Sequence, residues 1–249
     1  MYTSPRPTID TISRYYHSDQ YISHTNRSTT VFDIVYKIAR FFTNSQKVRL
    51  LKSLKSEGTI LDYGCGTGYF ATRAASSGYN VVAYEPDSQA ASQIQSRESL
   101  KVIESLTSIS AKSLDLITAW HVIEHVHNPM ETLSDLRKKL KKGGHLIVAV
   151  PNYKSYDSNY YKENWAALDV PRHLTHFSKR SFEKFAAVKK MKLVGIQPMK
   201  LDSYYVALLT EMKVLKKKSF IKAFQIGRKS NRKARISGDY SSLIYVLKK

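Results

Sequence analysis

From residue 58 onward the sequence alternates between short apolar runs and segments with helical periodicity. Five runs have the length and the Val, Ile and Leu content of buried strands, at residues 59–63, 80–85, 100–105, 113–120 and 145–151. Segments with helical periodicity lie among them at residues 69–78, 87–97 and 129–144. Such alternation is typical of a parallel sheet that helices cover on both faces. We therefore expect an α/β chain with a Rossmann-like, doubly wound sheet.

The segments on either side of this core complete the expected architecture. Residues 1–44 should form an N-terminal helical cap, with a helix at 31–42, and the main domain should span residues 45–249, beginning with a short helix at 45–54. A helix at 178–191 and two more strands, at 192–200 and 241–249, bring the expected sheet to seven strands. Residues 203–236 precede the last strand and are expected to form a basic helical insertion.

The charge of the chain is strongly positive and unevenly distributed. Forty Lys and Arg residues against twenty Asp and Glu residues give a formal net charge of +20 in 249 residues. Thirteen of the basic residues and only three of the acids lie between Lys200 and Lys249. This excess fits either a solvated face or an attraction for an anionic partner, such as nucleic acid, an acidic lipid surface or a polyanionic metabolite.

Cysteine content and hydropathy bear on the compartment. A single cysteine excludes a disulfide framework within the chain and fits a reducing environment. The first residues contain no apolar leader segment, and the longest apolar runs have the length of strands. The expectation is therefore a cytoplasmic protein without a membrane span.

A glycine-rich loop follows the first apolar run and precedes a helix, at residues 64–68 in the stretch "ILDYGCGTGYF". Open α/β sheets bind ligands at this position. The dinucleotide pattern G-x-G-x-x-G requires a glycine where Tyr69 stands, and the nucleoside triphosphate pattern requires a lysine that is absent here. Asp62 places a negative charge beside the loop, which repels phosphate and suits a cationic ligand.

The stretch "LDYGCGTGYF" resembles motif I of class I S-adenosylmethionine (SAM)-dependent methyltransferases. Glu85 stands 21 positions after Gly64, where that family has an acidic residue, and "HVIEHV" resembles a later motif in order and spacing. The resemblance covers residues 45–198 and is closest to the small-molecule branch that includes the ubiquinone-biosynthesis O-methyltransferases. It implies the class I methyltransferase fold, with an antiparallel last strand and an N-terminal lid over the cofactor. The implied activity is methyl transfer from SAM to an oxygen or nitrogen of a small-molecule acceptor.

The resemblance also assigns cofactor-binding roles to individual residues. Glu85 should accept hydrogen bonds from both ribose hydroxyls, because the two oxygens of a carboxylate can each accept one hydrogen bond from a diol. The methionine end of SAM should contact the glycine-rich loop at residues 64–68. Cys65 is expected to serve in this loop as a small residue and not as a nucleophile. The predicted cofactor-binding residues are Asp62, Gly64, Cys65, Gly66, Gly68, Glu85, Pro86, Ser105 and Leu106.

Histidines supply the candidate catalytic groups. His121 follows the fourth predicted strand, and His173 and His176 follow the fifth in "DVPRHLTHF". A hydroxyl acceptor needs a general base, and His121 or His173 is the candidate, with a pKa suited to neutral pH. Structural or cofactor-contacting roles for these histidines stay open. His121, Glu124 and His125 also match H-x-x-E-H, the inverted zinc-protease signature, but the short space before Pro129 argues against a metal-binding helix, so no metal is expected.

The acceptor leaves several possibilities open. Five aromatic residues between the fifth strand and Trp165 could wall an apolar acceptor pocket: Tyr153, Tyr156, Tyr160, Tyr161 and Trp165. The expected acceptor is a small molecule, possibly anionic. The positive charge makes an RNA-directed methyltransferase the alternative, although "WHVIEH" stands where base N-methylating enzymes have an Asn/Asp-Pro-Pro-aromatic motif. A non-catalytic SAM-binding subunit is the remaining alternative, which SAM binding without turnover would favour.

Overall fold

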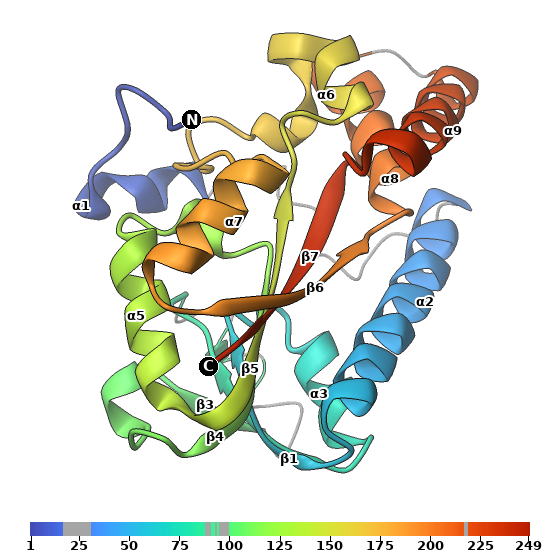
Figure 1. Cartoon of the computed structure of the whole chain (residues 1–249). Helices are drawn as coiled ribbons and strands as arrows, with labels where there is room; N and C mark the ends of the chain where they lie inside the picture. Colours follow the sequence, from blue (N-terminus) through green and yellow to red (C-terminus); the bar gives the residue numbers. More distant parts are fainter. Residues whose placement is uncertain (17–30, 88–90, 93, 95–99, 217–218) are drawn as a thin grey trace. The chain divides into compact units, whose positions relative to one another are not determined.

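The computed structural model describes residues 1–16, 31–87, 91–92, 94, 100–216 and 219–249 (Figure 1). The chain forms two compact units, each described below by itself. Unit 1 comprises residues 1–16, 121–133 and 148–247, and unit 2 comprises the described residues among 17–120 together with 134–147 and 248–249. Most of the helix predicted at 87–97 lies outside the described residues.

Unit 2 contains the parallel strands that carry the glycine-rich loop. Strand β1 (Gly58–Tyr63) pairs in parallel with β2 (Tyr79–Tyr84) on one side and with β4 (Leu114–Trp120) on the other. Strand β3 (Lys101–Ile103) pairs in parallel with β2. The six residues Leu114–Ala119 of β4 are all buried, as expected for a strand that is covered on both faces. Helix α3 (Tyr69–Ala75) joins β1 to β2.

Helix α2 (Val31–Leu54) is one continuous helix of 24 residues, so the prediction of two separate helices at 31–42 and 45–54 was wrong. Thr43 and Asn44 have a low helix propensity but do not break a helix, and no Gly or Pro stands between residues 31 and 54. Residue 44, the expected boundary of the N-terminal cap, lies within this helix.

The sheet has seven strands in the order β3-β2-β1-β4-β5-β7-β6. Strand β5 (Leu140–Pro151) runs through both units, and β6 (Lys192–Pro198) and β7 (Ser242–Lys248) belong largely or wholly to unit 1. Gly143, near the beginning of β5, donates a hydrogen bond to Lys249, and Asn152, just after its end, donates one to Ser241. Strand β7 is therefore antiparallel to β5, and the seven-stranded Rossmann-like prediction is confirmed.

Strand β5 begins five residues earlier than expected, because residues 140–144 were assigned to the preceding helix. Helix α5 (Pro129–Lys139) ends before them. A Cβ atom on Gly144 would lie 2.9 Å from the backbone oxygen of Asp115. Because Gly144 has no side chain, β5 can approach the backbone of Asp115, the second residue of β4, closely. The helical pattern of residues 129–144 does not predict this contact.

In unit 1, helices surround the last two strands (Figure 1). The helices are α1 (Ile9–Ile12), α6 (Tyr156–Tyr161), α7 (Lys179–Val188), α8 (Asp202–Leu209) and α9 (Phe220–Ser237), with a π-helical turn at Thr210–Val214. Short 3₁₀ turns lie at Ser13–Tyr15, Ile123–His125, Lys162–Asn164 and Ala166–Leu168, and a further one in unit 2 lies at Leu106–Ser108. The predicted helical insertion before the last strand is thus formed by α8 and α9. Among the described residues, no helix combines the length and the hydrophobicity needed to cross a membrane.

The N-terminal residues of unit 1 lie against the segment that carries His173 and His176. Tyr2 bridges to Thr175, and the Thr3 side chain donates a hydrogen bond of 2.6 Å to the backbone oxygen of His173. The expected N-terminal lid over the cofactor stays a prediction, and residues 17–30 lie outside the described part of the chain.

Candidate active site

The glycine-rich loop of unit 2 makes the turn from β1 into α3. Gly64, Gly66 and Gly68 all have positive φ values, of 73°, 55° and 76°, a conformation that only glycine adopts without strain. Among the described residues beyond its chain neighbours, no atom would lie within 4 Å of a Cβ atom on Gly66. The backbone at Gly66 therefore faces open space, where a ligand can approach it closely.

Glu85 follows β2 and closes one side of this loop. Its Oε2 accepts a hydrogen bond of 2.7 Å from the Gly66 amide, and its Oε1 accepts one of 3.2 Å from the Asp87 amide. Burial raises the pKa of Glu85, partly offset by these two backbone bonds. Since β1 and β2 are parallel and in register from Gly58 with Tyr79 to Tyr63 with Tyr84, their carboxyl ends meet, and Glu85 lies beside the loop. Its contact with the ribose stays a prediction.

Asp62 lies at the carboxyl end of β1 and is 1% exposed. Its Oδ1 accepts a hydrogen bond of 2.7 Å from the Thr118 hydroxyl of β4. Burial raises the pKa of Asp62 to about 6, against the opposing effects of Thr118 and Lys47. Asp62 is therefore mostly ionised at neutral pH, which gives the loop the negative charge that a sulfonium ligand favours.

The remaining predicted cofactor residues lie on the same edge of the sheet or within the loop. Ser105 and Leu106 follow β3, which pairs with β2 up to Tyr84 and Ile103, and the Ser105 hydroxyl accepts a hydrogen bond of 3.2 Å from the Thr107 amide. Pro86 directly follows Glu85. Burial raises the pKa of the Cys65 thiol far above its usual range, so Cys65 stays protonated and is a poor nucleophile.

His121 follows β4 and belongs to unit 1, where two carboxylates contact its ring. Its Nδ1 lies 3.4 Å from Oε1 of Glu124, and its Nε2 lies 3.3 Å from Oδ2 of Asp202 at the beginning of α8. Burial opposes the charge on His121, but the two carboxylates outweigh it and raise its pKa to about 9. The expectation of a pKa suited to neutral pH is therefore wrong for His121, which is an imidazolium at pH 7.

His173 has the opposite environment. Its Nδ1 lies 2.9 Å from the backbone oxygen of Ala167, so Nδ1 carries the proton in this hydrogen bond and Nε2 keeps a lone pair. Burial, together with the neighbouring His125, lowers its pKa well below the usual value. The pKa of His173 thus also departs from the expected neutral range, downward, and the side chain is uncharged at pH 7.

His125 and His176 extend this group of histidines. The His125 ring packs edge-to-face on His173 with centroids 4.5 Å apart, and its Nδ1 lies 3.0 Å from the Tyr16 hydroxyl. His176 Nε2 lies 3.1 Å from the Thr3 hydroxyl. Burial lowers the pKa of both histidines, so neither adds a positive charge at pH 7.

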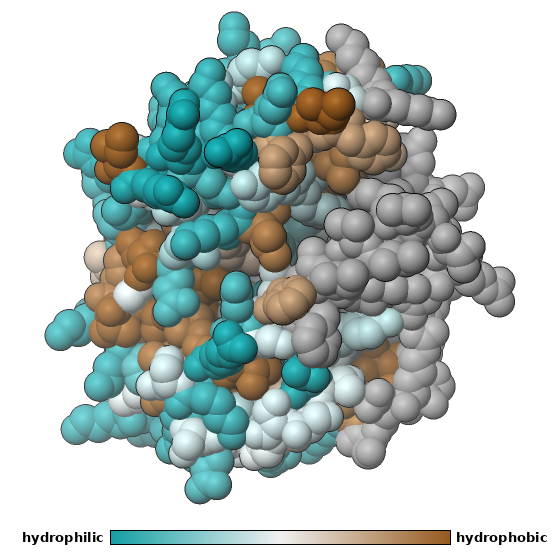
Figure 2. All heavy atoms as spheres, turned by 90° about the vertical axis from the view of Figure 1, so that its right-hand side faces the viewer, coloured by the Kyte–Doolittle hydropathy of each residue, from teal (hydrophilic) through white to brown (hydrophobic). Residues whose placement is uncertain are grey.

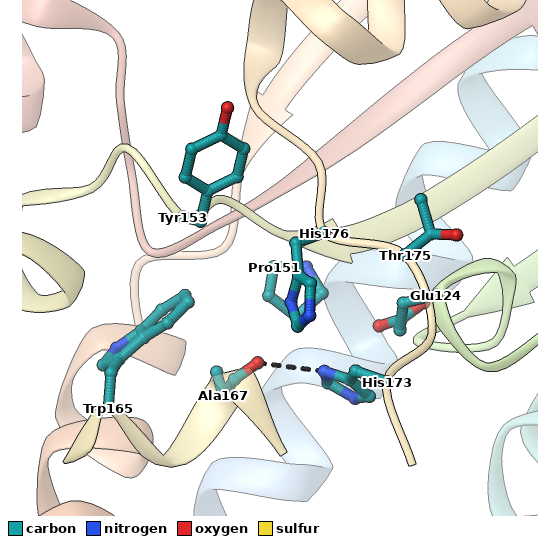
Figure 3. A pocket seen from close by; sticks show the side chains of 8 residues that line it. All are labelled: Glu124, Pro151, Tyr153, Trp165, Ala167, His173, Thr175 and His176. Carbon is teal, nitrogen blue, oxygen red and sulfur yellow. Dashed lines mark hydrogen bonds between the residues drawn. The ribbon is translucent and has the colours of Figure 1, made fainter. Parts of the chain in front are cut away.

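A small pocket in unit 1 brings several of these groups together. Figure 3 shows its lining, in which Glu124, His173 and His176 face two aromatic side chains across the pocket. The lining residues are Glu124, Pro151, Tyr153, Trp165, Ala167, His173, Thr175 and His176. Tyr153 and Trp165 are the two that line it among the five aromatic residues expected to wall the acceptor pocket. In the same unit, Tyr161 is buried and donates a hydrogen bond of 3.0 Å to Glu211.

Within the described residues, Glu124, His125 and His173 each offer one atom within 4.8 Å of the others and could together hold a metal ion. The inverted zinc-protease arrangement requires His121 and His125 on one face of a helix. Here the segment forms only the single 3₁₀ turn Ile123–His125, and His121 stands before it with a φ of 56°. That arrangement is not formed, and the expectation of no metal stays a prediction.

Two features of this site could not be read from the sequence. Asp202 reaches His121 from a position 81 residues further along the chain, and no local spacing indicates this contact. Glu124 is 1% exposed, and its carboxylate lies 3.4 Å from the ring of His121, a burial that its charged side chain does not predict. The predicted cofactor-binding residues lie in unit 2 and the predicted catalytic histidines in unit 1.

Residues 37–187 match a protein-family model described as a methyltransferase domain. The chain belongs to this methyltransferase-domain family. Over 143 residues it is 29% identical to a ubiquinone biosynthesis O-methyltransferase of Rickettsia typhi, a match that covers 54% of this chain and 58% of that protein. The chain thus spans less than two thirds of the length of this relative.

Solved structures of other methyltransferases share the fold of this family member. A SAM-dependent methyltransferase from Archaeoglobus fulgidus superimposes with a TM-score of 0.60 at 18% identity, over 88% of this chain and 100% of that one. Phosphoethanolamine N-methyltransferase 2 from Haemonchus contortus, solved with SAM, gives a TM-score of 0.57 at 16% identity, over 82% of this chain and 52% of that one. The family match assigns the chain to the methyltransferase-domain family, and the solved structures show that it shares their fold.

The histidines of this methyltransferase domain predict a stability that depends on pH in two opposite ways. His121 has a pKa raised from 6.5 to about 9, so its contribution is complete below pH 6.5 and is lost as the pH rises through about 9. His125, His173 and His176 have lowered pKa values. Their contribution is complete above pH 6.5 and is lost as the pH falls through their folded-state pKa values.

We expect the alkaline loss to be about 1–2 kcal/mol, a reduced value because solvent screens a partly exposed charge; the His121 side chain is 33% exposed. Chemical denaturation of the wild type and of His121→Gln between pH 6.5 and about 9 measures this loss of unfolding free energy. The variant should lack the decline between pH 6.5 and about 9 that the wild type shows. An equal decline in both proteins would exclude His121 as its source.

Proposed function

We propose that this chain transfers the methyl group of SAM to a small-molecule acceptor. The observation that carries the proposal is the hydrogen bond from the Gly66 amide to Glu85, which brings a carboxylate to a glycine loop that faces open space. A carboxylate in this place suits a ribose diol, and the ionised Asp62 suits a sulfonium. Because the sulfonium is already an activated methyl donor, the protein mainly has to align the acceptor atom with the methyl carbon and the leaving sulfur.

His173 is the residue we propose as general base. Its Nδ1 is engaged with the backbone oxygen of Ala167, which leaves the Nε2 lone pair to accept a proton. It lines the pocket together with Tyr153 and Trp165, whose aromatic rings suit a flat or apolar acceptor. A hydroxyl acceptor fits this arrangement, as in the O-methyltransferase of Rickettsia typhi to which the chain is similar.

His121 has a different proposed role, as a positive charge that pairs with the carboxyl groups of Glu124 and Asp202. Glu124 is the acidic residue that lines the pocket, and the lowered pKa values of His173 and His176, which also line it, leave those rings uncharged at pH 7. The pocket therefore favours a neutral or cationic acceptor, and the anionic acceptor that the composition allowed has no support here.

Transfer of a labelled methyl group tests the proposal. The enzyme is incubated with methyl-labelled SAM and either a metabolite extract or purified RNA, and the label is then followed into each fraction. We expect label in small molecules and none in RNA. Label confined to RNA would favour the RNA-directed alternative, and SAM binding without any transfer would favour the non-catalytic subunit.

A further inference from the structure

Helix α9 carries a face that neither the SAM site nor the acceptor pocket uses. Its 18 residues include six Lys and Arg and no Asp or Glu. Five of the basic residues are exposed: Arg228, Lys229, Arg232, Lys233 and Arg235. Within the described parts of the chain, none of the three arginines forms an ion pair with an acid. The helix therefore presents an uncompensated positive charge to its surroundings.

The same helix also exposes large apolar side chains. Phe220, Ile221 and Phe224 in its first two turns are 52%, 76% and 59% exposed, and Ile236 near its end is 94% exposed. Val214, in the π-helical turn before α9, is exposed as well. Figure 2 shows hydrophobic residues among hydrophilic ones on the side of the molecule where α9 lies in Figure 1. A group of exposed apolar side chains of this kind marks an interaction site.

The inward face of α9 packs against the rest of unit 1 without using these exposed apolar side chains. The inward face of α9 consists of small or medium side chains, namely Ala223, Ile226, Gly227, Ser230 and Ala234. A Cβ atom on Gly227 would lie 2.7 Å from the Tyr204 ring of α8. Ser230 donates a hydrogen bond of 2.7 Å to the buried Asp157. The helix is thus held through its inward face, and its outward face is exposed in the part of the chain that the structure describes.

We propose that the outward face of α9 docks on an anionic phospholipid surface. With 3.6 residues per turn, Phe220, Phe224, Arg228 and Arg235 fall on one side of the helix, so apolar and basic side chains share a face. Phe and Ile side chains can enter the interface between head groups and acyl chains, while Lys and Arg reach the lipid phosphates. The highly exposed Ile221 and Ile236 favour a hydrocarbon partner over nucleic acid, which offers them no matching surface.

Lysines that stack on tyrosines extend this face to α6. The Nζ atoms of Lys229 and Lys233 lie 5.3 and 5.2 Å from the centre of the Tyr156 ring, and Lys222 lies 5.8 Å from that of Tyr160. Tyrosine is an interfacial residue, because its ring is apolar and its hydroxyl is polar. This docking goes beyond the proposed methyl transfer and does not depend on it.

Sedimentation with vesicles tests the docking on the full chain. The wild type should pellet with vesicles of phosphatidylcholine mixed with phosphatidylglycerol, remain in the supernatant with phosphatidylcholine alone, and be released by salt. Phe220→Ser/Ile221→Ser/Phe224→Ser and Arg228→Gln/Arg232→Gln/Arg235→Gln should each weaken the partitioning by ~10-fold or more. All six residues are exposed, and thermal melting checks that both variants fold.

Lys101→Gln/Lys142→Gln/Lys192→Gln is the matched control, because it removes the same charge from exposed positions outside α9. Its partitioning should equal that of the wild type. Equal loss in the control would reduce the effect to net charge and overturn the proposal, as would wild-type partitioning of both α9 variants. The proposal would also be overturned if the wild type bound no vesicles but bound RNA, and if only the arginine variant lost that RNA binding. That result would favour a nucleic-acid surface.

Discussion

Gly66→Val should weaken the binding of SAM by ~100-fold or more, equivalent to about 2.7 kcal/mol, in a chain that still folds. Two effects act together. The φ of 55° at Gly66 disfavours a β-branched residue by about 1–3 kcal/mol, and the new side chain would fill the open space that the ligand needs. Because an added Cβ meets no atom of the described residues within 4 Å, a loss of binding would not come from a clash with that part of the protein. Calorimetric titration with SAM gives the change in affinity.

Gly78→Val separates these two effects. Gly78 has a φ of 92°, and a Cβ atom there would come no closer than 3.9 Å to the Lys52 amino group. It precedes β2, at the opposite end of that strand from Glu85, so it shares the backbone strain but not the loop. This control should lower the melting temperature about as much as Gly66→Val and leave the affinity for SAM unchanged. Normal SAM affinity in a folded Gly66→Val variant would contradict the proposed site.

His173→Ala should lower kcat by ~100-fold, the usual contribution of a general base, with little change in the affinity for SAM. The physical reason is the loss of the Nε2 lone pair that we propose accepts the proton of the acceptor hydroxyl. Because His173 is buried and its Nδ1 bonds to the Ala167 oxygen, His173→Gln is a second variant that retains a hydrogen-bond donor. Both rates are measured under saturating SAM and normalised to the folded fraction.

His127→Ala is the control for this prediction. His127 is only partly buried, its Nε2 contacts the backbone oxygen of Pro7 at 3.0 Å, and it is not among the residues that line the pocket. Its kcat should be close to that of the wild type. If His173→Ala and His173→Gln also turn over at the wild-type rate, His173 is not the base. A parallel loss of SAM affinity would instead indicate a contact with the cofactor.

The SAM-binding half of this account follows from local sequence patterns. A buried strand, a glycine-rich turn and a helix are consecutive in the chain, so the loop could be placed without knowing the rest of the fold. Glu85 could be placed as well, because two parallel strands joined by one short helix end at the same edge of a sheet.

The catalytic half depends on contacts that no spacing reveals. His121 meets Asp202, which stands at the beginning of an insertion whose packing is set by tertiary contacts such as Gly227 against Tyr204. The protonation states depend on the same contacts. From the sequence alone, both His121 and His173 are expected to have the ordinary pKa of a histidine. In the fold, carboxylate neighbours raise the pKa of the first, and burial among other histidines lowers that of the second.

The partner of the positively charged segment also could not be predicted from the sequence alone. Its position before the last strand could be read from the sequence, and an acidic lipid surface was one of several anionic partners that it allowed. Exposure of Phe220, Ile221 and Phe224 on the same helix is what distinguishes a lipid surface from nucleic acid, and burial cannot be assigned to single apolar residues of a helix without the packing around them.

The central claim, that Glu85 and the glycine loop hold SAM, is tested most directly by calorimetric titration of SAM into the wild type, Glu85→Ala and Glu57→Ala. Glu57 is an exposed carboxylate of the same unit and serves as the matched control. We predict saturable binding to the wild type, an equal affinity for Glu57→Ala, and a loss of about ten- to a hundred-fold for folded Glu85→Ala, about 1.5–3 kcal/mol for a charge-assisted pair of hydrogen bonds. Unchanged affinity in folded Glu85→Ala, or no binding of SAM to the wild type, would contradict the account.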